Sequence, residues 1–435
     1  MRKLRYYLGA LILGAALLAG CSKTTPTNET PTVTPETTVT PEATATPEPT
    51  EAPEPTKKPT PTPKPTPTPA GANLPEGINL KNTYGKTFGR MGTCINAFQM
   101  SDLAIWELLQ THYSSITMEN EMKPDSILGG GSPTKMSVED AKALGYVIPE
   151  NYKEDVVPKL NFYYTDRAIE LCVKYDLGLR GHTLVWHSQT PNWFFRENYD
   201  RNGAVVSPEV MDARMEFFIR SVMGHVYDNE NGTVVYSWDV VNEFIHSDGV
   251  GWQEVYGNEG IKAGFVKKAF QIADDVLKQY GIRDQVSLLY NDYGTYGVIP
   301  QILELLEFIN SDGKVCDGVG MQSHLSDNDD PHPIKYVTAM KKFLEAGYEV
   351  QITELDVGST NEMYQANYFY DIMKRVLALK KEGANITGIT LWGFADTNSW
   401  RSDEKPLLFK TLKTPKTSYY KVLEAYVDAG LYVEE

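Results

Sequence analysis

The sequence predicts an α/β fold, a closed (β/α)8 TIM barrel, and three observations lead to that prediction. From residue 74 onward, short apolar stretches alternate with amphipathic stretches of helical period, a rhythm typical of βα units around a parallel sheet. Eight strand candidates occur, the number that closes such a barrel. The chain of 435 residues is long enough for a barrel of about 250 residues with insertions.

The expected strands are short and apolar, and the clearest expected helices lie in the second half of the chain. The strands are predicted at Gly92–Ala97, Ser115–Met118, Gly178–Val185, Ser237–Asn242, Ser287–Asn291, Gly318–Gln322, Val350–Glu354 and Gly388–Trp392. Helical periodicity marks Phe265–Tyr280, Ile334–Ala346 and Tyr364–Lys381. Residues 73–435 are therefore expected to form one domain.

The charge of the chain restricts its partners. The sequence has 57 acidic and 41 basic residues, a net charge of -16, and the excess of acid lies after residue 70. A domain of that sign repels phosphate backbones, so nucleic acid is excluded as a partner and a neutral polymer is favoured. The four cysteines form no CxxC pair or zinc spacing, and Cys94, Cys172 and Cys316 are expected as small buried residues.

The first 21 residues have the pattern of an export signal. Arg2, Lys3 and Arg5 precede an apolar run from Leu8 to Gly20, too short for a membrane span. The run ends at Leu18-Ala19-Gly20-Cys21, which resembles a bacterial lipoprotein signal and implies lipidation of Cys21. The alternatives are ordinary cleavage, which would secrete the protein, and an uncleaved anchor.

Residues 22–72 are expected to be a disordered linker. The stretch from Thr24 to Ala70 is almost wholly Thr, Pro, Glu, Ala and Lys, which offers nothing to bury. At about 3.1 Å per residue in polyproline II form, it reaches on the order of 100 Å. We therefore expect an exported domain tethered to a bacterial membrane only through its lipid anchor.

Most of the expected strands end in polar residues, which a buried strand would not choose without partners. They are Asn96, Glu119-Asn120-Glu121, His182, Asn242-Glu243, Asn291-Asp292, Gln322, His324, Glu354 and Trp392. In a barrel the carboxyl ends of the strands converge on one face, where catalytic groups lie. Crowded carboxylates, amides and imidazoles beside aromatic rings favour binding of a polyol, whose hydroxyls need donors and acceptors.

Glu243 and Glu354 are the candidate catalytic pair. Cleavage of a glycosidic bond needs one carboxyl to protonate the leaving oxygen and another to attack the anomeric carbon. A single glutamate at a strand end is often a structural ion-pair partner, and two could form a metal site. Amides and aromatics outnumber further ligands around these two, so no metal and no cofactor is expected.

The motifs together resemble those of glycoside hydrolase family 10, the barrel xylanases, from about Gly85 to Tyr426. The matching stretches are Glu119-Asn120-Glu121-Met122-Lys123, Arg180 to Gln189 (RGHTLVWHSQ), Trp238 to Glu243 (WDVVNE), Gln351 to Asp356 (QITELD), Leu391-Trp392-Gly393 and Ser399-Trp400-Arg401. The resemblance implies an endo-1,4-β-xylanase that cleaves internal bonds of xylan with retention of configuration. A monomer that acts on xylan or xylo-oligosaccharides is expected.

The resemblance also implies roles for individual residues. Glu243 would be the acid/base, Glu354 the nucleophile, Asn242 a partner of the sugar 2-hydroxyl and His324 a partner of Glu354. Gln322, Asn291 and Tyr293 would lie around the pair. The other implied sugar contacts are Glu119, Asn120 and Lys123 for the sugar beyond the cleaved one, and His182, Trp186, Trp392 and Trp400 around the cleaved one.

Other residues in the motifs are expected to be structural. His187 and Trp193 are more readily explained by packing than by sugar contact. Asp356, two residues after Glu354, is expected to orient its neighbours by hydrogen bonds. Trp106, Trp238 and Trp252 are also assigned to the core.

The stretch Ser126–Asn161 departs from the family pattern because it is longer than usual. It follows the second strand, so it is expected to lie on the catalytic face as an insertion, at about 126–161. One hypothesis is that it shapes outer sugar sites, and the alternative is a surface insertion without substrate contact.

Two other functions compete with xylan hydrolysis. A related barrel hydrolase could act on cellulose or mannan, against which the tryptophan and lysine positions argue. A ring placed where a glucose hydroxymethyl would project discriminates by steric exclusion. A polysaccharide-binding protein without activity would keep the aromatics but lose a carboxylate, and both carboxylates are present.

Overall fold

The computed structural model describes residues 71–247, 250–326 and 331–433. The predicted export signal, Cys21 and all but the last two residues of the predicted linker lie outside this range. Within it, no helix combines the length and the hydropathy that a membrane span requires.

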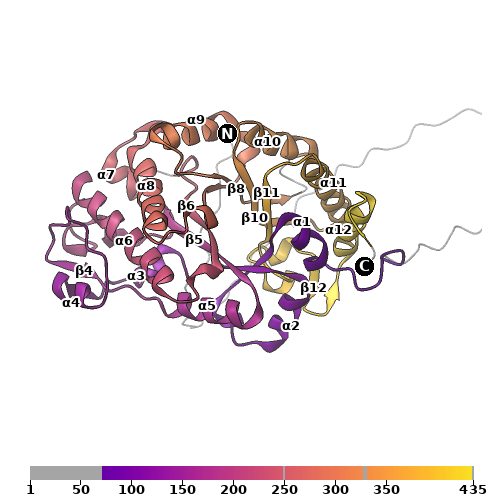
Figure 1. The fold of residues 1–435 in the computed structure, drawn as a ribbon, viewed down its shortest axis with the longest axis horizontal. Helices are drawn as coiled ribbons and strands as arrows, with labels where there is room; N and C mark the ends of the chain where they lie inside the picture. Colours follow the sequence, from indigo (N-terminus) through magenta and orange to yellow (C-terminus); the bar gives the residue numbers. More distant parts are fainter. Residues whose placement is uncertain (1–70, 248–249, 327–330, 434–435) are drawn as a thin grey trace, which may run out of the picture. The chain divides into compact units, whose positions relative to one another are not determined.

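Eight parallel strands close into a barrel, as the sequence predicts (Figure 1). Their order around the barrel is β11-β1-β2-β5-β6-β7-β8-β10, and β10 pairs with β11 to complete the ring. The strands are β1 (Met91–Ile95), β2 (Ser115–Met118), β5 (Gly178–Trp186), β6 (Val235–Asn242), β7 (Ser287–Asp292), β8 (Gly318–Met321), β10 (Glu349–Gly358) and β11 (Ile386–Leu391).

Helices surround the barrel and connect successive strands (Figure 1). The long ones are α2 (Leu103–His112), α5 (Tyr163–Tyr175), α6 (Pro208–Asp228), α8 (Gly264–Gln279), α9 (Ile299–Ile309), α10 (Pro333–Glu345), α11 (Glu362–Lys381) and α12 (Thr417–Asp428). The three helices predicted from periodicity are therefore confirmed as α8, α10 and α11, with ends shifted by one or two residues.

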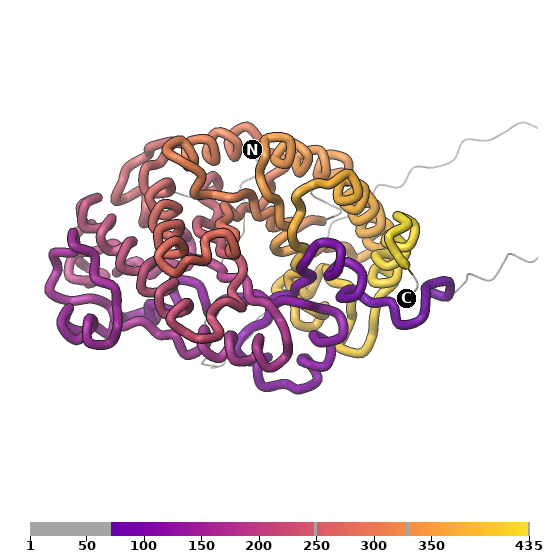
Figure 2. The backbone as a smooth tube through the Cα atoms, in the orientation of Figure 1, coloured from indigo at the N-terminus to yellow at the C-terminus, as the bar shows by residue number. Residues whose placement is uncertain are grey.

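The chain runs once around the barrel, so its first and last strands become neighbours (Figure 2). Parallel pairing joins Met91 of β1 to Ile389 of β11. Motifs almost 300 residues apart in the sequence therefore share one end of the barrel, which is the condition for a common site.

The strand ends differ from the prediction in two informative ways. β10 does not stop at Glu354 but continues to Gly358, because its last residues pair with an extra short strand, β9 (His324–Ser326). Trp392 and Gln322 follow β11 and β8 directly instead of ending them. Glu354 thus lies inside a strand that is paired beyond it.

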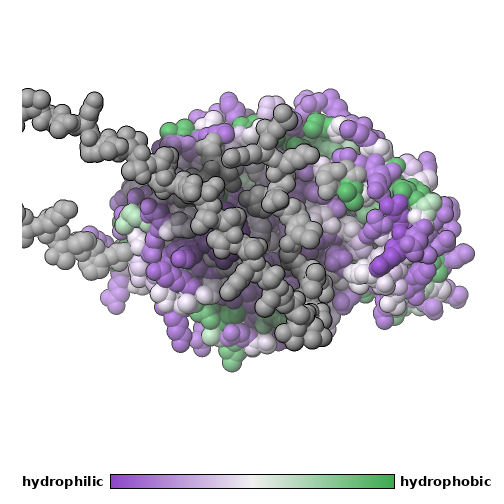
Figure 3. Space-filling view, turned by 180° about the vertical axis from the view of Figure 1, so that it is seen from behind, coloured by the Kyte–Doolittle hydropathy of each residue, from purple (hydrophilic) through white to green (hydrophobic). Residues whose placement is uncertain are grey.

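The barrel strands are buried on both faces, and side chains of neighbouring strands also interlock on the outer face, under the helices. A Cβ on Gly181 of β5 would lie 2.2 Å from the indole of Trp238 on β6, so only glycine leaves room for that ring. Trp106, Trp193, Trp238 and Trp252 are all buried, as are the three cysteines, which confirms their assignment to packing. On the face shown in Figure 3, coloured residues are mainly hydrophilic, with hydrophobic ones in small groups.

The predicted insertion folds into regular structure of its own. It contains most of α3 (Pro124–Leu128), then β3 (Lys135–Ser137), α4 (Val138–Ala143) and β4 (Val156–Pro158), and β3 pairs with β4 in an antiparallel ribbon. Ile127 and Val157 lie in the main hydrophobic core. Glu154 pairs with the buried guanidinium of Arg214 in α6, so the segment is packed against the barrel's outer helices.

Candidate active site

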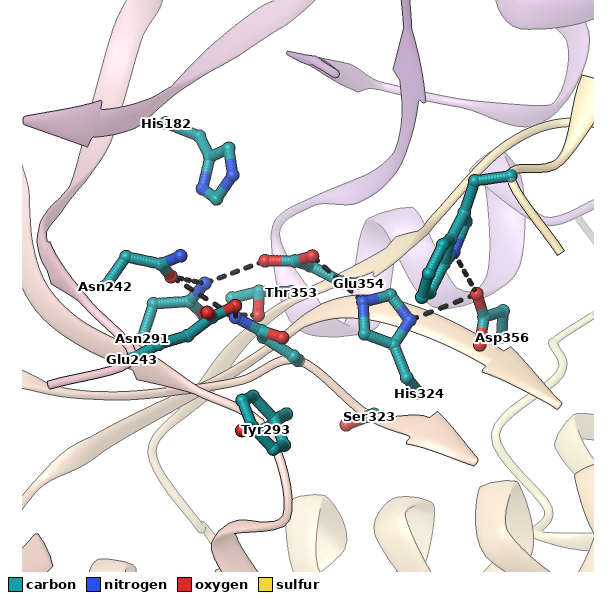
Figure 4. Close-up of polar contacts among 12 residues, drawn as sticks. His182, Asn242, Glu243, Asn291, Tyr293, Ser323, His324, Thr353, Glu354 and Asp356 are labelled. Atoms are coloured by element: carbon teal, nitrogen blue, oxygen red, sulfur yellow. Dashed lines mark hydrogen bonds and ion pairs between the residues drawn. The ribbon is translucent and has the colours of Figure 1, made fainter. Parts of the chain in front are cut away.

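Glu243 and Glu354 lie at the carboxyl end of the barrel, joined by side-chain amides (Figure 4). Gln322 donates to Glu243 Oε1 at 2.8 Å and to Asn242 Oδ1 at 3.3 Å. Asn291 donates to Asn242 Oδ1 and to Glu354 Oε1, both at 2.8 Å. The amides of β6, β7 and β8 thus form a continuous bridge between the two carboxyls.

The bridge depends on the backbone at two positions. Glu243 has a φ of +57°, in the left-handed region that non-glycine residues seldom occupy, directly after the last residue of β6. A Cβ on Gly320 would lie 2.3 Å from Asn291 Oδ1, so only glycine in β8 leaves room for that amide. Such strain persists where the surrounding structure over-determines it, as at active sites.

Glu243 has neutral hydrogen-bond partners. Trp186 donates its indole N–H to Oε2 at 2.8 Å, opposite the bond from Gln322. Burial raises the pKa of Glu243 to about 7, and the nearby charge of Glu354 adds to the rise, against the opposing hydrogen bond from Gln322. This carboxyl is therefore protonated over the acidic half of the pH range.

Glu354 has charged neighbours instead. His324 Nε2 lies 3.1 Å from its Oε2, opposite the bond from Asn291. Burial favours the protonated form of Glu354, but the His324 hydrogen bond and the charges of His182, His324 and Lys123 outweigh it and lower the pKa to about 2. This carboxyl is therefore ionised under ordinary conditions.

His324 is held in its charged form by a second acid. Its Nδ1 lies 3.0 Å from Asp356 Oδ2. Burial opposes its charge, but Asp356 and Glu354 raise the pKa of His324 to about 10. Asp356 also accepts hydrogen bonds from Trp400 Nε1 at 3.0 Å and Arg401 at 2.6 Å, which confirms the prediction that it orients its neighbours.

His182 is fixed by a buried ion pair below the site. Its Nδ1 lies 2.9 Å from Asp239 Oδ2, and Arg180 binds the other oxygen of Asp239 at 2.5 Å. Arg180 and Asp239 are fully buried on adjacent strands. The sequence analysis gave Asp239 no role. The available signal was its place in the WDVVNE stretch, and in the structure it pairs with His182 across β5 and β6.

Lys123 stands on one side of the pair, in the loop after β2. Its ammonium group bonds Gln189 Oε1 at 2.9 Å and Asn120 Oδ1 at 3.3 Å, and it lies 4.8 Å from the ring centre of Trp186. Burial lowers the pKa of Lys123, against the raising charges of Glu354 and Glu119. Gln189, at the end of the RGHTLVWHSQ stretch, is a further site residue that sequence reasoning left without a role.

Tyr293 lies in the loop after β7, three strands from β2 around the barrel. Its half-exposed ring stacks on His246, with ring centres 4.2 Å apart. His246 Nδ1 in turn lies 2.8 Å from the buried Asp292. His246 was not anticipated, because it belongs to no motif and is brought to the site only by the loop that follows Glu243.

Two aromatic contacts line the end of the barrel near His324. Trp392 is buried and meets His182 edge-on, with ring centres 5.4 Å apart. Trp400 meets His324 at 5.1 Å and is 59% exposed, so one face of its indole is free for a ligand. His187 meets the ring of Trp186 edge-on, with ring centres 6.2 Å apart.

The structure therefore brings together the residues singled out from the sequence, from seven barrel strands and the loops that follow them. They are Glu119, Asn120, Lys123, His182, Trp186, Asn242, Glu243, Asn291, Tyr293, Gln322, His324, Glu354, Trp392 and Trp400. In the described ranges, no group of three or more His, Cys, Asp or Glu side chains is placed to hold a metal ion. A protonated and an ionised carboxyl in one site suit acid-assisted displacement.

Comparison with known proteins agrees with this arrangement. The family model for glycosyl hydrolase family 10 matches residues 79–425. Endo-1,4-β-xylanase A of Butyrivibrio fibrisolvens is 45% identical over 349 residues, which cover 80% of this chain and 85% of that protein. The bifunctional endo-1,4-β-xylanase XylA of Ruminococcus flavefaciens is 36% identical over 79% of this chain, but this match covers only 34% of that longer protein.

Solved structures lead to the same family. The N-terminal modules of the Clostridium thermocellum endo-1,4-β-D-xylanase 10B, complexed with xylohexaose, superpose with a TM-score of 0.65 at 29% identity, covering 77% of this chain and 65% of that one. An endoxylanase of the same family from a sugarcane soil metagenome gives 0.63 at 26% identity, covering 80% and 99%. With the paired carboxyls, the closed barrel and a family match over most of its length, the chain belongs to glycosyl hydrolase family 10.

Proposed function

We propose that this protein is an endo-1,4-β-xylanase that hydrolyses internal bonds of xylan with retention of anomeric configuration. The observation that carries the proposal is the opposite protonation of Glu243 and Glu354, two carboxyls bridged by amides at one barrel end. Relatives with 45% and 36% identity bear the name endo-1,4-β-xylanase, which supports xylan as the substrate.

The reaction would proceed in two displacements. Glu354 attacks the anomeric carbon while Glu243 gives its proton to the departing glycosidic oxygen, and a glycosyl-enzyme ester forms. Glu243, now ionised, takes a proton from water, which attacks the same carbon and releases Glu354. Two inversions restore the original configuration. Retention needs carboxyls about 5–5.5 Å apart, and the electrostatic effect of Glu354 on Glu243 supports close spacing.

The surrounding residues would position the sugar rings. The Asn242 amide oxygen accepts from Gln322 and Asn291, which orients its NH2 group away from them, toward the place of the sugar 2-hydroxyl. Lys123, Asn120 and Glu119 would bind the next sugar on the glycone side, the side of the attacked ring. Trp392 and Trp400 would enclose the attacked ring, and their bulk favours xylose over hexoses that carry a hydroxymethyl group.

The test is release of reducing sugar from β-1,4-xylan by residues 71–435, beside Glu243→Ala, Glu354→Ala and the control Glu345→Ala, an exposed glutamate of α10. We expect both site variants to lose about a hundredfold or more, since general acid catalysis alone contributes that much, and the control to match wild type. NMR of the first products should show the β-anomer. Faster cleavage of glucan than of xylan, or α-anomer as first product, would overturn the proposal.

We further propose that the protein is exported and held at the cell surface by lipid on Cys21, with residues 22–72 as spacer. The support is the basic, apolar and small-residue order that ends at Leu18-Ala19-Gly20-Cys21 and the Thr/Pro composition that follows. Xylan is a polymer outside the cell, so a tethered catalytic domain fits that substrate.

A further inference from the structure

We propose that Phe98 is a stacking platform for a xylose ring of the glycone, one position farther from the cleaved bond than the sugar at Glu119 and Lys123. This inference deepens the proposed function and rests on it. Phe98 lies in the short 3-10 helix η2 (Ala97–Gln99), which follows β1 at the carboxyl end of the barrel. It is 92% exposed, the highest value among the exposed large hydrophobic residues of the described chain.

The turn that presents Phe98 is fixed by hydrogen bonds on both sides of it. The backbone N–H of Asn96 donates to Gln99 Oε1 at 2.9 Å, and the N–H of Gln99 donates to the Asn96 carbonyl at 3.0 Å. The N–H of Ala97 donates to Glu121 Oε1 at 2.7 Å. Because these bonds fix the backbone of the turn, a ligand that binds Phe98 does not have to order the backbone first. An exposed ring on such a turn is therefore well suited to bind a ligand.

The same contacts place the turn beside the proposed sugar site. Asn96 donates its side-chain amide to Glu119 Oε2 at 3.1 Å, and Glu119 is followed by Asn120, which bonds Lys123. The charges of Glu354 and Glu119 both act on Lys123, so these groups form one continuous site. The chain of contacts thus runs from Glu354 through Lys123 and Glu119 to Asn96, which begins the turn with Phe98.

The position also determines which part of the substrate Phe98 meets. Tyr293 and His246 lie in the loops after β7 and β6, beside Asp292. Lys123 and Glu119 follow β2, three strands from β7 around the barrel, where the proposed function places the glycone. A chain that extends past Glu119 next meets the η2 turn. The C–H faces of a xylose ring are apolar and free of a hydroxymethyl group, so they can cover a phenyl ring and remove it from water.

The experiment uses aryl β-xylosides with two and three xylose residues and compares the trioside-to-bioside ratio of kcat/KM. We expect wild type to prefer the trioside and Phe98→Ala to lower that ratio about fivefold, from the apolar area left in water. Phe98→Trp should keep the ratio. The matched control is Leu103→Ala, an exposed apolar residue that begins α2 a few positions later, which should not change the ratio.

The outcomes separate this inference from the proposed function. If wild type hydrolyses neither xyloside and does not degrade xylan, the proposed function is wrong. If wild type is active but shows no preference for the trioside, or Phe98→Ala keeps the wild-type ratio, Phe98 is no platform. An equal loss on both substrates by Phe98→Ala also overturns the inference, because it indicates a general disturbance of the site.

Discussion

Glu354 is buried and Glu243 is partly buried, and yet they titrate far apart, because their partners differ. Glu243 is bonded by neutral groups, Gln322 and Trp186, so the effect of burial prevails. Glu354 has His324 as a charged partner and Lys123 nearby, so the effect of burial is reversed. The acid and the nucleophile are thus distinguished by their neighbours and not by their own chemistry.

A first prediction concerns the alkaline limb of the pH profile. Activity requires Glu243 protonated, so kcat/KM should fall as the pH rises through about 7. Gln322 stabilises the ionised form of Glu243, and Gln322→Ala should therefore raise the pKa of Glu243 and move this limb to higher pH. The measurement is kcat/KM on an aryl xylobioside from pH 4 to 9, and a shift to lower pH would contradict the role of Gln322.

A second prediction concerns the acidic limb. His324→Gln removes the charge that holds the pKa of Glu354 near 2, so that pKa should rise and the acidic limb should move upward. The ionised Glu354 stabilises the fold above its ordinary pKa of 4.5, and wild type loses this contribution only as the pH falls through about 2. His225→Gln, in a pair with Asp166 on the outer helices, is the control, and an acidic limb that is the same in both variants would refute this role.

At the residue scale, motifs predicted which side chains meet but not every partner. Glu243, Glu354 and His324 could be named because they sit at strand ends in familiar stretches. His246 could not, because it belongs to no motif and reaches Tyr293 only through the loop after Glu243. Gln189 ends a quoted motif, but its bond to Lys123 joins two loops that only the closed barrel brings together.

At the scale of elements, the strands were predictable from apolar stretches, and their ends were less so. β10 extends beyond Glu354 only because β9 pairs with it, and that pairing depends on where the chain runs after β8. The segment at 126–161 was recognised by its length alone. Its own ribbon and helix, and its core residues, show that it also supports the flank of the barrel.

A third prediction tests that support. Arg214 is fully buried and donates hydrogen bonds to both carboxylate oxygens of Glu154 and to the carbonyls of Phe194 and Arg196. Glu154→Ala leaves the guanidinium short of partners and should lower the free energy of unfolding by about 2 kcal/mol. Urea unfolding of residues 71–435 measures this. Glu170→Ala, in an exposed pair with Arg167, should cost less than about 1 kcal/mol, and equal losses would contradict the argument.

The influence of the segment 126–161 on outer sugar sites stays a prediction. A deletion that preserves the fold should change the lengths of the xylo-oligosaccharides released from xylan, measured by chromatography. An unchanged product pattern and affinity would leave the segment with its packing role only.

At the scale of the whole molecule, closure of the barrel makes the site. The chain passes once around, so the first strand pairs with the last (Figure 2). Thr93 of β1 lies opposite Leu391 of β11, the residue before Trp392. The excess of acidic over basic residues lies in the same domain. This negative charge favours a neutral polymer as substrate and disfavours nucleic acid as a partner.

A fourth prediction concerns the tether. Cys21→Ser in the full chain should move the enzyme from the membrane fraction of a bacterial host to the soluble exported fraction, because the lipid has no attachment site. Its kcat/KM on soluble xylo-oligosaccharides should equal that of the unchanged chain. The measurement is activity in each fraction, and a variant that stays with the membrane would indicate an uncleaved anchor instead.

The sequence by itself determined the barrel, the helices α8, α10 and α11, the two glutamates and the family resemblance, because apolar periodicity and motif order are local properties of the chain. Only the tertiary structure decided the amide bridge from Glu243 to Glu354, the clamp of Asp239 on His182, the stacking of His246 on Tyr293 and the exposure of Phe98. These contacts join segments that are distant in sequence. Their geometry, and with it the separation of the two pKa values, exists only once the barrel is closed.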